Sequence, residues 1–282
     1  MNVSIRYYIV LFFCCAQVLR SSAQSSAQIT TTTDTLRVKQ LFTIAATASR
    51  IETDKLGNIY AYIGKEWVKY NSEGVECCRF SEHSLTATDV FDVSNPQKVL
   101  LYMPSVTFGE VLDRALTEEQ HFNLTNSRFE ISSACTASDG NIWVNSIFYK
   151  NIFKINRNGD EIPLAVEWTP YYTNDGLIAN FMVQENDRVY LNVPNAGIFI
   201  FDDFGKFLKT IDLKLKEPFQ VFGNKIVYYN NEKIHIFDVS LPIETAYYLP
   251  ISAAISVKVQ NNALVAMQKD KIVVYKVLKP LK

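Results

Sequence analysis

Cysteine and histidine are scarce in this chain, and their spacing excludes the common zinc and redox motifs. Five Cys and three His occur among 282 residues. Cys77 and Cys78 are adjacent, which fits neither a CxxC redox motif nor a zinc knuckle, and Cys135 stands alone. Successive residues of a strand point to opposite faces, so no disulfide framework is expected. We expect Cys77, Cys78 and Cys135 to be buried free thiols or small apolar side chains.

The histidines and the known catalytic motifs give no signal for an enzyme. His83, His121 and His235 lie far apart and form no pair with the spacing of metal ligands. The chain has no Gly-x-Ser-x-Gly elbow, no phosphate-binding loop and no HExxH helix. The sequence therefore favours a non-catalytic protein without a cofactor or a metal, in which each histidine is solvated or part of the core.

Basic residues are not in excess either. The chain carries 28 Lys and Arg against 29 Asp and Glu, a net charge of −1, with no basic stripe. Proteins that bind nucleic acid neutralise its phosphates with clustered Lys and Arg. A nucleic acid partner is therefore not expected, and the composition leaves the oligomeric state open.

Long apolar runs are missing except near the N-terminus. Residues 7–19 form an apolar stretch that follows Arg6 and precedes a group of small residues. This pattern is typical of a signal peptide, which predicts removal of residues 1–23 and a periplasmic, cell-surface or extracellular location. A membrane span needs about 20 apolar residues and Arg20 ends the run, so no stable membrane insertion is expected. Residues 24–33, rich in Ser, Thr and Gln, are expected to be a flexible leader.

A repeated strand pattern is what the sequence has in abundance. The segment at residues 57–74 reads GNIYAYIGKEWVKYNSEG, and the segment at residues 140–159 repeats its pattern as GNIWVNSIFYKNIFKINRNG. Each copy reads as two strands rich in β-branched and aromatic residues, joined by turns with Asn and Gly. Equivalent positions of the second strand recur at steps of 40, 43, 47, 37 and 38 residues: Ile59, Val99, Ile142, Val189, Ile226 and Leu264. Such a period is typical of a propeller blade, which is a four-stranded antiparallel sheet.

The two ends of the repeat region complement each other. The sixth repeat stops at its third strand, residues 273–277, whereas residues 35–44 precede the first repeat as an outer strand without a blade. We expect this early strand to become the fourth strand of the last blade, because that pairing closes the ring and removes exposed sheet edges. The prediction is an all-β, six-bladed β-propeller that forms a single domain over residues 34–282.

The motif itself resembles that of a known superfamily. The motif consists of Asp-x-x-Gly-Asn-Ile-Tyr, followed by Ile/Val-x-Lys-Tyr/Phe and then by Asn-x-x-Gly, with the best copies at residues 54–74 and 139–159. It resembles the repeat of six-bladed propellers of the NHL and TolB-like superfamily. The resemblance covers residues 35–278. The second repeat departs most, with Asn95-Pro96 as its first turn. This resemblance implies a scaffold on which lyases, lactonases, sugar or peptide binders and interaction platforms all occur.

The inner strands of the predicted propeller offer few ligands for a metal. Propeller enzymes with a metal gather ligands where these strands begin, but here those starts contain one acidic residue, Asp89, and no histidine. A divalent cation needs several oxygen or nitrogen ligands, so no metal site is expected. Asp54 and Asp139 fall in first turns on the opposite face, where Asp commonly accepts hydrogen bonds from its own backbone.

One connection is longer and more aromatic than its blade requires. Residues 165–176 account for the longest step between repeats, 47 residues, and propeller topology places them on the same face as two turns of the third and fourth blades. The candidate binding residues on this face are Trp168, Tyr171, Tyr172, Phe148, Tyr149 and Asn195. Aromatic side chains on loops over a rigid scaffold are typical of recognition surfaces. The alternative is that Trp168 fills a gap between two blades.

Three functional classes follow from these observations. The first is an exported, non-catalytic propeller that binds a protein, peptide or glycan over one face, favoured by the aromatic connection and the missing catalytic motifs. The second is a propeller enzyme of the lyase, lactonase or hydrolase type. The third is a TolB-like component of a cell-envelope assembly. The sequence identifies no particular ligand.

Overall fold

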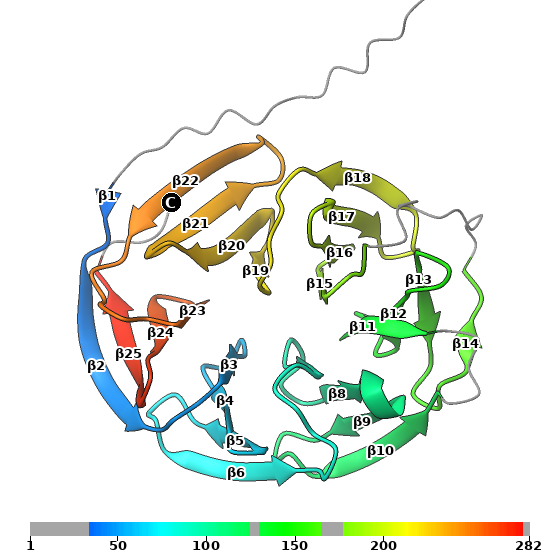
Figure 1. Ribbon diagram of the computed structural model, residues 1–282, viewed down its shortest axis with the longest axis horizontal. Coiled ribbons are helices and arrows are strands. Elements are labelled where there is room, and N and C mark those ends of the chain that lie inside the picture. The colour runs from blue at the N-terminus through cyan, green and yellow to red at the C-terminus, as the bar shows by residue number, and fades with distance from the viewer. Residues whose placement is uncertain (1–33, 125–129, 165–176, 279–282) are drawn as a thin grey trace, which may run out of the picture.

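Six antiparallel sheets are arranged around a central axis in the computed structural model, which describes residues 34–124, 130–164 and 177–278 (Figure 1). The prediction of an all-β, six-bladed propeller with four-stranded blades is confirmed. In the described part of the chain the one helical element is a single 3-10 turn, η1 (Pro104–Val106). None of the helices in that part is long and apolar enough to cross a membrane.

Each of the first five blades uses four strands in the order in which they follow along the chain, counted outward from the axis. The first three blades consist of β3 (Arg50–Thr53), β4 (Ile59–Ile63), β5 (Glu66–Tyr70) and β6 (Glu76–Ser81); β7 (Val90–Asp92), β8 (Val99–Met103), β9 (Phe108–Leu112) and β10 (Glu118–Asn123); and β11 (Ile131–Thr136), β12 (Ile142–Ser146), β13 (Asn151–Ile155) and β14 (Glu161–Ile162). The next two consist of β15 (Phe181–Glu185), β16 (Arg188–Val193), β17 (Gly197–Asp202) and β18 (Phe207–Ile211); and β19 (Gln220–Phe222), β20 (Lys225–Asn230), β21 (Lys233–Asp238) and β22 (Ile243–Tyr248).

The sixth blade closes the ring with a strand from the start of the chain. It combines β23 (Ser256–Gln260), β24 (Ala263–Met267) and β25 (Lys271–Val277) with β2 (Val38–Ala45), which lies along β25 on the perimeter (Figure 1). β2 and β25 are antiparallel, with Val38 opposite Val277 and Ala45 opposite Lys271. The predicted pairing of the two ends of the chain is therefore confirmed.

The beginning of this strand differs from the prediction of one continuous strand over residues 35–44. β1 (Asp34–Thr35) pairs in parallel with β22 of the fifth blade, and only then does the chain cross to the sixth. Leu36 explains the break, because its side chain is buried in the apolar cluster between these two blades and its amide donates to the carbonyl oxygen of Tyr248 at 2.9 Å. The N-terminal segment thus ties two blades together.

The repeated motif of the first blade builds a contact to the next blade. Asp54 organises its turn, since its Oδ1 accepts hydrogen bonds from the amides of Leu56 and Asn58, and its Oδ2 accepts one from the Tyr60 hydroxyl at 2.9 Å. Lys69 lies with its Nζ 5.3 Å from the centre of the Tyr60 ring and donates to the carbonyl oxygen of Arg114 in the second blade. The expectation that Asp54 shapes its own turn agrees with these bonds.

The third blade repeats this contact with the same residue types. Lys154 Nζ lies 2.9 Å from Asp139 Oδ2, 4.4 Å from the centre of the Trp143 ring and 3.5 Å from the carbonyl oxygen of Asp203 in the fourth blade. Cation–π contacts of a desolvated lysine are worth about 2 kcal/mol. The Asp, aromatic and Lys positions of the motif therefore recur because together they join a blade to its successor.

The outer strands share an irregularity at one position, and it overturns one prediction. In four blades the fourth strand carries one extra residue close to its start, at Leu41, Cys77, Glu119 and Leu208. Such a β-bulge leaves the extra residue unpaired and re-aims its side chain. Cys77 is consequently exposed, so the prediction that it is buried is wrong, whereas Cys78 is half-buried and Cys135 is buried; all three are free thiols.

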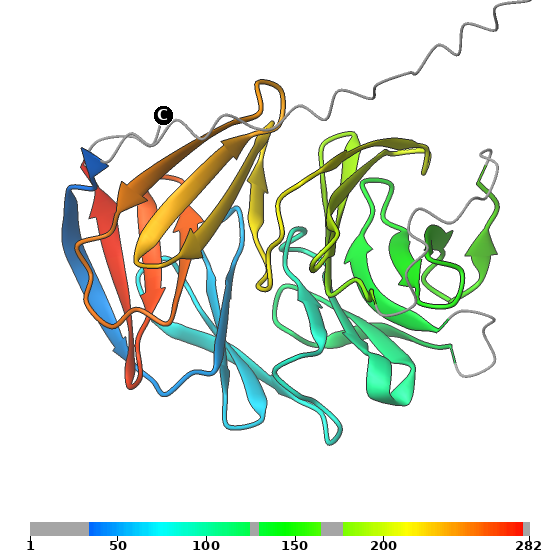
Figure 2. The ribbon, with the colours of Figure 1, turned by 45° about the horizontal axis from the view of Figure 1, so that its top comes forward.

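The core lies between blades, where the faces of neighbouring sheets pack against each other (Figure 2). Between the first two blades Trp67 stacks on Phe91, with ring centres 3.9 Å apart and an angle of 8° between the planes. Because every blade packs on two neighbours, side chains that lie near the axis are held by strands of several blades. This arrangement fixes the positions of the polar groups near the axis.

Candidate functional site

The propeller has two faces that carry different loops. One face, called here the connection face, carries the links between blades and the turns between second and third strands, such as residues 147–150 and 194–196. The opposite face, called the turn face, carries the turns between first and second strands and between third and fourth strands, such as residues 54–58 and 203–206. Of the candidate residues from the sequence, Phe148, Tyr149 and Asn195 lie on the connection face.

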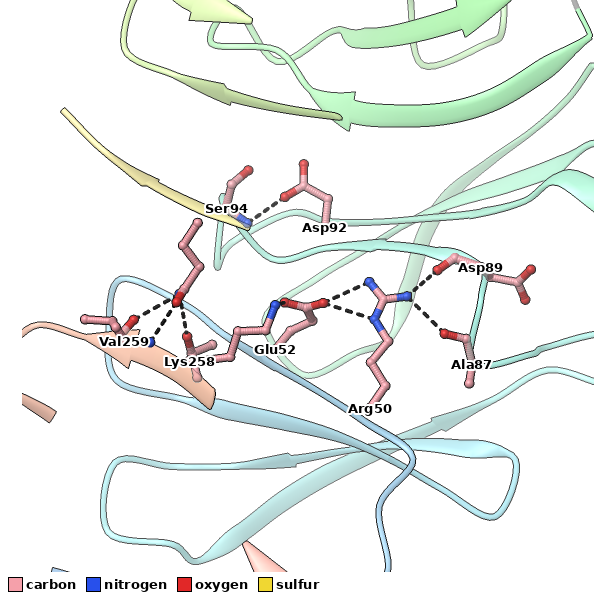
Figure 3. Close-up of polar contacts among 10 residues, drawn as sticks. Arg50, Glu52, Ala87, Asp89, Asp92, Ser94, Lys258 and Val259 are labelled. Carbon is pink, nitrogen blue, oxygen red and sulfur yellow. Dashed lines mark hydrogen bonds and ion pairs between the residues drawn. The ribbon is translucent and has the colours of Figure 1, made fainter. Parts of the chain in front are cut away.

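A chain of charged groups runs across the inner strands near the axis (Figure 3). Lys258 Nζ on β23 lies 2.7 Å from Glu52 Oε2 on β3, and Glu52 Oε1 accepts hydrogen bonds from Arg50 Nε and Nη2 at 3.0 and 2.9 Å. Arg50 Nη1 then donates to the carbonyl oxygens of Ala87 and Asp89, at 3.1 and 2.6 Å, in the segment that leads into the second blade. This chain links the sixth, first and second blades.

The charged chain is largely buried, and Glu52 is the shared anion between its two cations. The side chains of Lys258 and Glu52 are 8% and 13% exposed. Burial by itself raises the pKa of Glu52, but the charges and hydrogen bonds of Lys258 and Arg50 outweigh it and hold the pKa below its usual value. Burial also raises the pKa of Asp89, whose Oδ2 accepts a hydrogen bond from the Thr86 amide at 2.7 Å. The arrangement is better suited to holding neighbouring blades together than to acid–base chemistry.

The starts of the inner strands pointed to Asp89 in the sequence, but not to Glu52 or Lys258. Both missed residues lie inside strands, in RIET and SVKVQ, where neighbouring positions are apolar or uncharged. A charge inside a short strand of the core is unusual, since Lys and Glu are rarely buried unless they are paired. That signal could have identified the partners of Arg50.

Other polar side chains tie the inner strands to adjacent blades. Gln220 accepts from the Val259 amide at 2.7 Å and donates to its carbonyl oxygen at 2.9 Å. Asp92 accepts hydrogen bonds from the amides of Ser94 and Thr136 (Figure 3 shows the first). These groups are thus engaged in holding the ring. Among the described residues, no three His, Cys, Asp or Glu side chains are grouped so that they could hold a metal ion.

The histidines are spread over three places in the fold. His83 is exposed in the link before the second blade, and His121 on β10 lies with its Nδ1 2.6 Å from Glu118 Oε1. His235 on β21 is half-buried, stacks on Tyr228 with ring centres 4.7 Å apart, and has its Nδ1 2.8 Å from Glu244 Oε1. The Tyr228 hydroxyl donates to the same carboxylate oxygen. His235 is therefore built into the packing of its blade.

On the connection face the turn of the third blade presents an aromatic side chain to solvent. Phe148 is 73% exposed. Its ring meets Tyr149 edge-on at 5.0 Å, and Tyr149 meets the buried Phe153 at 5.6 Å. The amides of Tyr149 and Lys150 donate to the hydroxyl and the carbonyl oxygen of Ser146, at 3.2 and 2.9 Å. Phe148 is thus held outward by a fixed turn.

The remaining candidate residues have different positions. Asn195 is exposed at the turn of the fourth blade, with a φ of 70° that places it in the left-handed region. Asn adopts this conformation more readily than most residues. The structure therefore brings Phe148 and Asn195 to the same face on adjacent blades. Trp168, Tyr171 and Tyr172 lie outside the described residues.

Glu110 is an isolated buried carboxyl group between the first two blades. It is 4% exposed, and its Oε2 has no hydrogen-bond partner among the described residues. Burial, with smaller effects from Glu118 and Glu82, raises its pKa to about 7, while His121 opposes the shift. The protonated form is therefore the one that the fold accommodates.

This carboxyl group should make stability depend on pH. Its pKa is higher in the folded than in the unfolded chain, so its contribution is fully present below pH 4.5 and is lost as pH rises to about 7. We expect Glu110→Gln to remove this loss and to stabilise the protein at pH 8 by about 1 to 2 kcal/mol after allowance for solvent screening. Urea unfolding at pH 5 and pH 8 measures the free energy of unfolding of both proteins, and Glu73→Gln, at an exposed position, serves as the control. An unchanged pH dependence in Glu110→Gln would contradict the assignment.

Comparison with known proteins supports the fold and nothing finer. No family model and no curated protein matches the sequence. Among solved structures, the chain is similar to BBS1N in complex with ARL6DN, with a TM-score of 0.58 and 10% identity over 88% of this chain and 99% of that one. It is also similar to virginiamycin B lyase from Staphylococcus aureus, with a TM-score of 0.53 and 13% identity over 86% of this chain and 99% of that one.

A third solved structure, BamB from Moraxella catarrhalis, has a TM-score of 0.47 and 10% identity, and covers 85% of this chain and 100% of that one. At such identities the similarity is one of fold alone, because one fold hosts many functions. The resemblance of the motif to NHL and TolB-like propellers remains a prediction.

Proposed function

We propose that this chain is an exported, non-catalytic propeller that binds a protein, peptide or glycan partner over its connection face. The observation that carries the proposal is the exposure of Phe148 on a turn that the fold holds in place. Export is supported by the apolar stretch at residues 7–19 after Arg6, which is typical of a signal peptide.

An exposed aromatic side chain that is already ordered is well suited to binding. Phe148 exposes most of its ring, so a partner that covers it gains the apolar burial of a large side chain. The contacts with Tyr149 and the bonds to Ser146 fix the turn beforehand, which lowers the conformational entropy lost on binding. Residues of this kind tend to dominate the energetics of interfaces.

Neighbouring polar groups would give such a surface its specificity. Asn195, on the adjacent blade, offers a carboxamide that can donate and accept hydrogen bonds. In the proposal Trp168, Tyr171 and Tyr172 extend the surface, on the strength of the sequence alone. The buried charges of Arg50, Glu52 and Lys258 are committed to one another, which favours a binding role over a catalytic one.

A matched pair of variants tests the surface. Phe148→Ala is expected to weaken partner binding at least tenfold, with little change in melting temperature, because truncating a central aromatic residue typically costs about 2 kcal/mol or more of binding energy. Phe204→Ala is the control, since Phe204 is 69% exposed but lies on the turn face. Photo-crosslinking from position 148 or 204 in the cells of origin identifies the partner. The affinity of that partner is then measured for the purified Phe148→Ala and Phe204→Ala variants.

The same experiment has an outcome that rejects the proposal. If crosslinks form from both positions alike, or if Phe148→Ala binds the partner as tightly as the unaltered protein does, the connection face is not the recognition surface. Sequencing the N-terminus of the mature protein tests export separately, with cleavage after Ala23 as the expected result.

A further inference from the structure

A groove opens on the turn face at the seam where the ring closes, between the sixth and first blades (Figure 1 shows the two blades side by side). It has a volume of about 310 Å³. Ligand sites in proteins generally occupy about 300 to 1,000 Å³, so this groove lies at the small end of that range. It is separate from the connection face and from the charged chain near the axis.

The walls of the groove are mostly apolar. Phe42 and Leu41 come from β2, Val274 comes from β25, and Leu56 comes from the first turn of the first blade. Leu41 is the extra residue of the bulge in β2 and is 52% exposed, and Leu56 is 62% exposed. Two large aliphatic side chains therefore stand uncovered on opposite sides of one depression.

The depression is maintained by close backbone packing. The Phe42 ring lies against Gly74, where an added Cβ would come within 2.6 Å of the ring, so Phe42 cannot swing toward the first blade. The small residues Gly57, Ser72 and Ala263 line the space between the walls. The groove thus exists because small side chains meet a fixed aromatic ring.

Two lysines stand opposite each other at the edge of the groove. Lys276 lines the groove, and Lys39 is its direct partner across the β2 and β25 pair. Both are exposed, and the described residues provide no ion pair for either. Like charges directly opposite on neighbouring strands are destabilising. No acidic residue lines the groove, and Asn261 and Asn262 add amide groups to its rim.

We propose that this groove binds a free single-chain carboxylic acid, with the carboxylate between Lys276 and Lys39 and the apolar chain along Leu41, Phe42 and Leu56. An anion placed there relieves the repulsion between the two ammonium groups, and charge-assisted hydrogen bonds are stronger than neutral ones. The volume holds about ten groups of the size of a water molecule. A chain of about eight to ten carbons therefore fits.

Titration with sodium decanoate, kept below its micelle concentration, tests the proposal. We expect saturable binding by the unaltered protein, followed by calorimetry or by shifts of methyl resonances lining the groove. Lys276→Ala and Lys39→Ala should each weaken binding roughly tenfold, in line with the loss of a hydrogen bond to a charged group. Decanol, which lacks the carboxylate, should bind more weakly by a similar factor. Ala263→Phe should fill the groove and abolish binding.

Controls separate this site from general effects of charge and surface. Lys271→Ala removes an exposed lysine from the other end of β25 and should leave decanoate binding unchanged. If Ala263→Phe does not fold, the surface variant with both Lys39→Ala and Lys276→Ala still decides the question. The proposal is overturned if decanoate shows no saturable binding, if decanol binds equally well, if Lys271→Ala has the same effect as Lys276→Ala, or if the protein binds phosphatidylglycerol vesicles but not the free acid.

Discussion

Deleting residues 1–45 is expected to abolish cooperative folding. The deletion removes β2, which provides seven paired positions along β25, and leaves that strand as an exposed edge. It also removes the buried side chains of Leu36 and Ile44 from the clusters on both sides of the sixth blade. Removing buried side chains of this size costs about 2 to 5 kcal/mol each, which together rivals the whole stability of a typical domain, about 5 to 15 kcal/mol.

Thermal unfolding followed by circular dichroism, with size-exclusion chromatography, measures this effect. A chain that starts at residue 34 serves as the control and should melt at the same temperature as one that starts at residue 24. The chain that starts at residue 46 should show no cooperative transition and an increased hydrodynamic radius. A sharp transition at an unchanged temperature in that chain would refute closure of the ring by β2.

Replacing Glu52 by Gln is expected to have the second-largest effect. The substitution removes one negative charge from between Lys258 and Arg50 and leaves two buried cations without compensation. Breaking a buried ion pair in this way costs about 3 to 5 kcal/mol. Because Glu52 joins residues of the sixth and first blades, the loss should appear in global unfolding rather than in local opening near the axis.

Urea unfolding of three variants distinguishes the charge effect from a change in packing. Lys55→Ala breaks an ion pair with Glu185 in which the lysine is 66% exposed, and it should cost less than about 1 kcal/mol. Adding Lys258→Met to Glu52→Gln should recover part of the lost stability, because it removes one of the two cations that Glu52→Gln leaves unpaired. If Glu52→Gln costs no more than Lys55→Ala, the charged chain does not stabilise the ring.

The repeat pattern was sufficient to predict the blades and their third strands. The run at residues 198–201, for example, alternates β-branched and aromatic residues and lies within β17. This strand is central in its sheet and buried on both faces, so its composition reports its position directly. Ring closure was predictable for a related reason, because an incomplete last blade needs a strand from elsewhere.

Features that depend on register could not be predicted. A bulge adds one residue without changing the composition of a strand, so nothing in the local sequence marked Leu41 or Cys77 as the extra residue. The switch of β1 to the fifth blade depends on the burial of Leu36 between two sheets, which is a tertiary contact. Glu52 and Lys258 are 206 residues apart and meet only because the ring is closed.

The closing strand pair has a mechanical consequence. Val38 stands opposite Val277, so the chain enters β2 and leaves β25 at the same end of the pair. Once β1 has separated from β22, tension applied to the two ends would therefore load the hydrogen bonds between β2 and β25 one after another, and not all together in shear. A propeller closed by such a pair is expected to open at low pulling force.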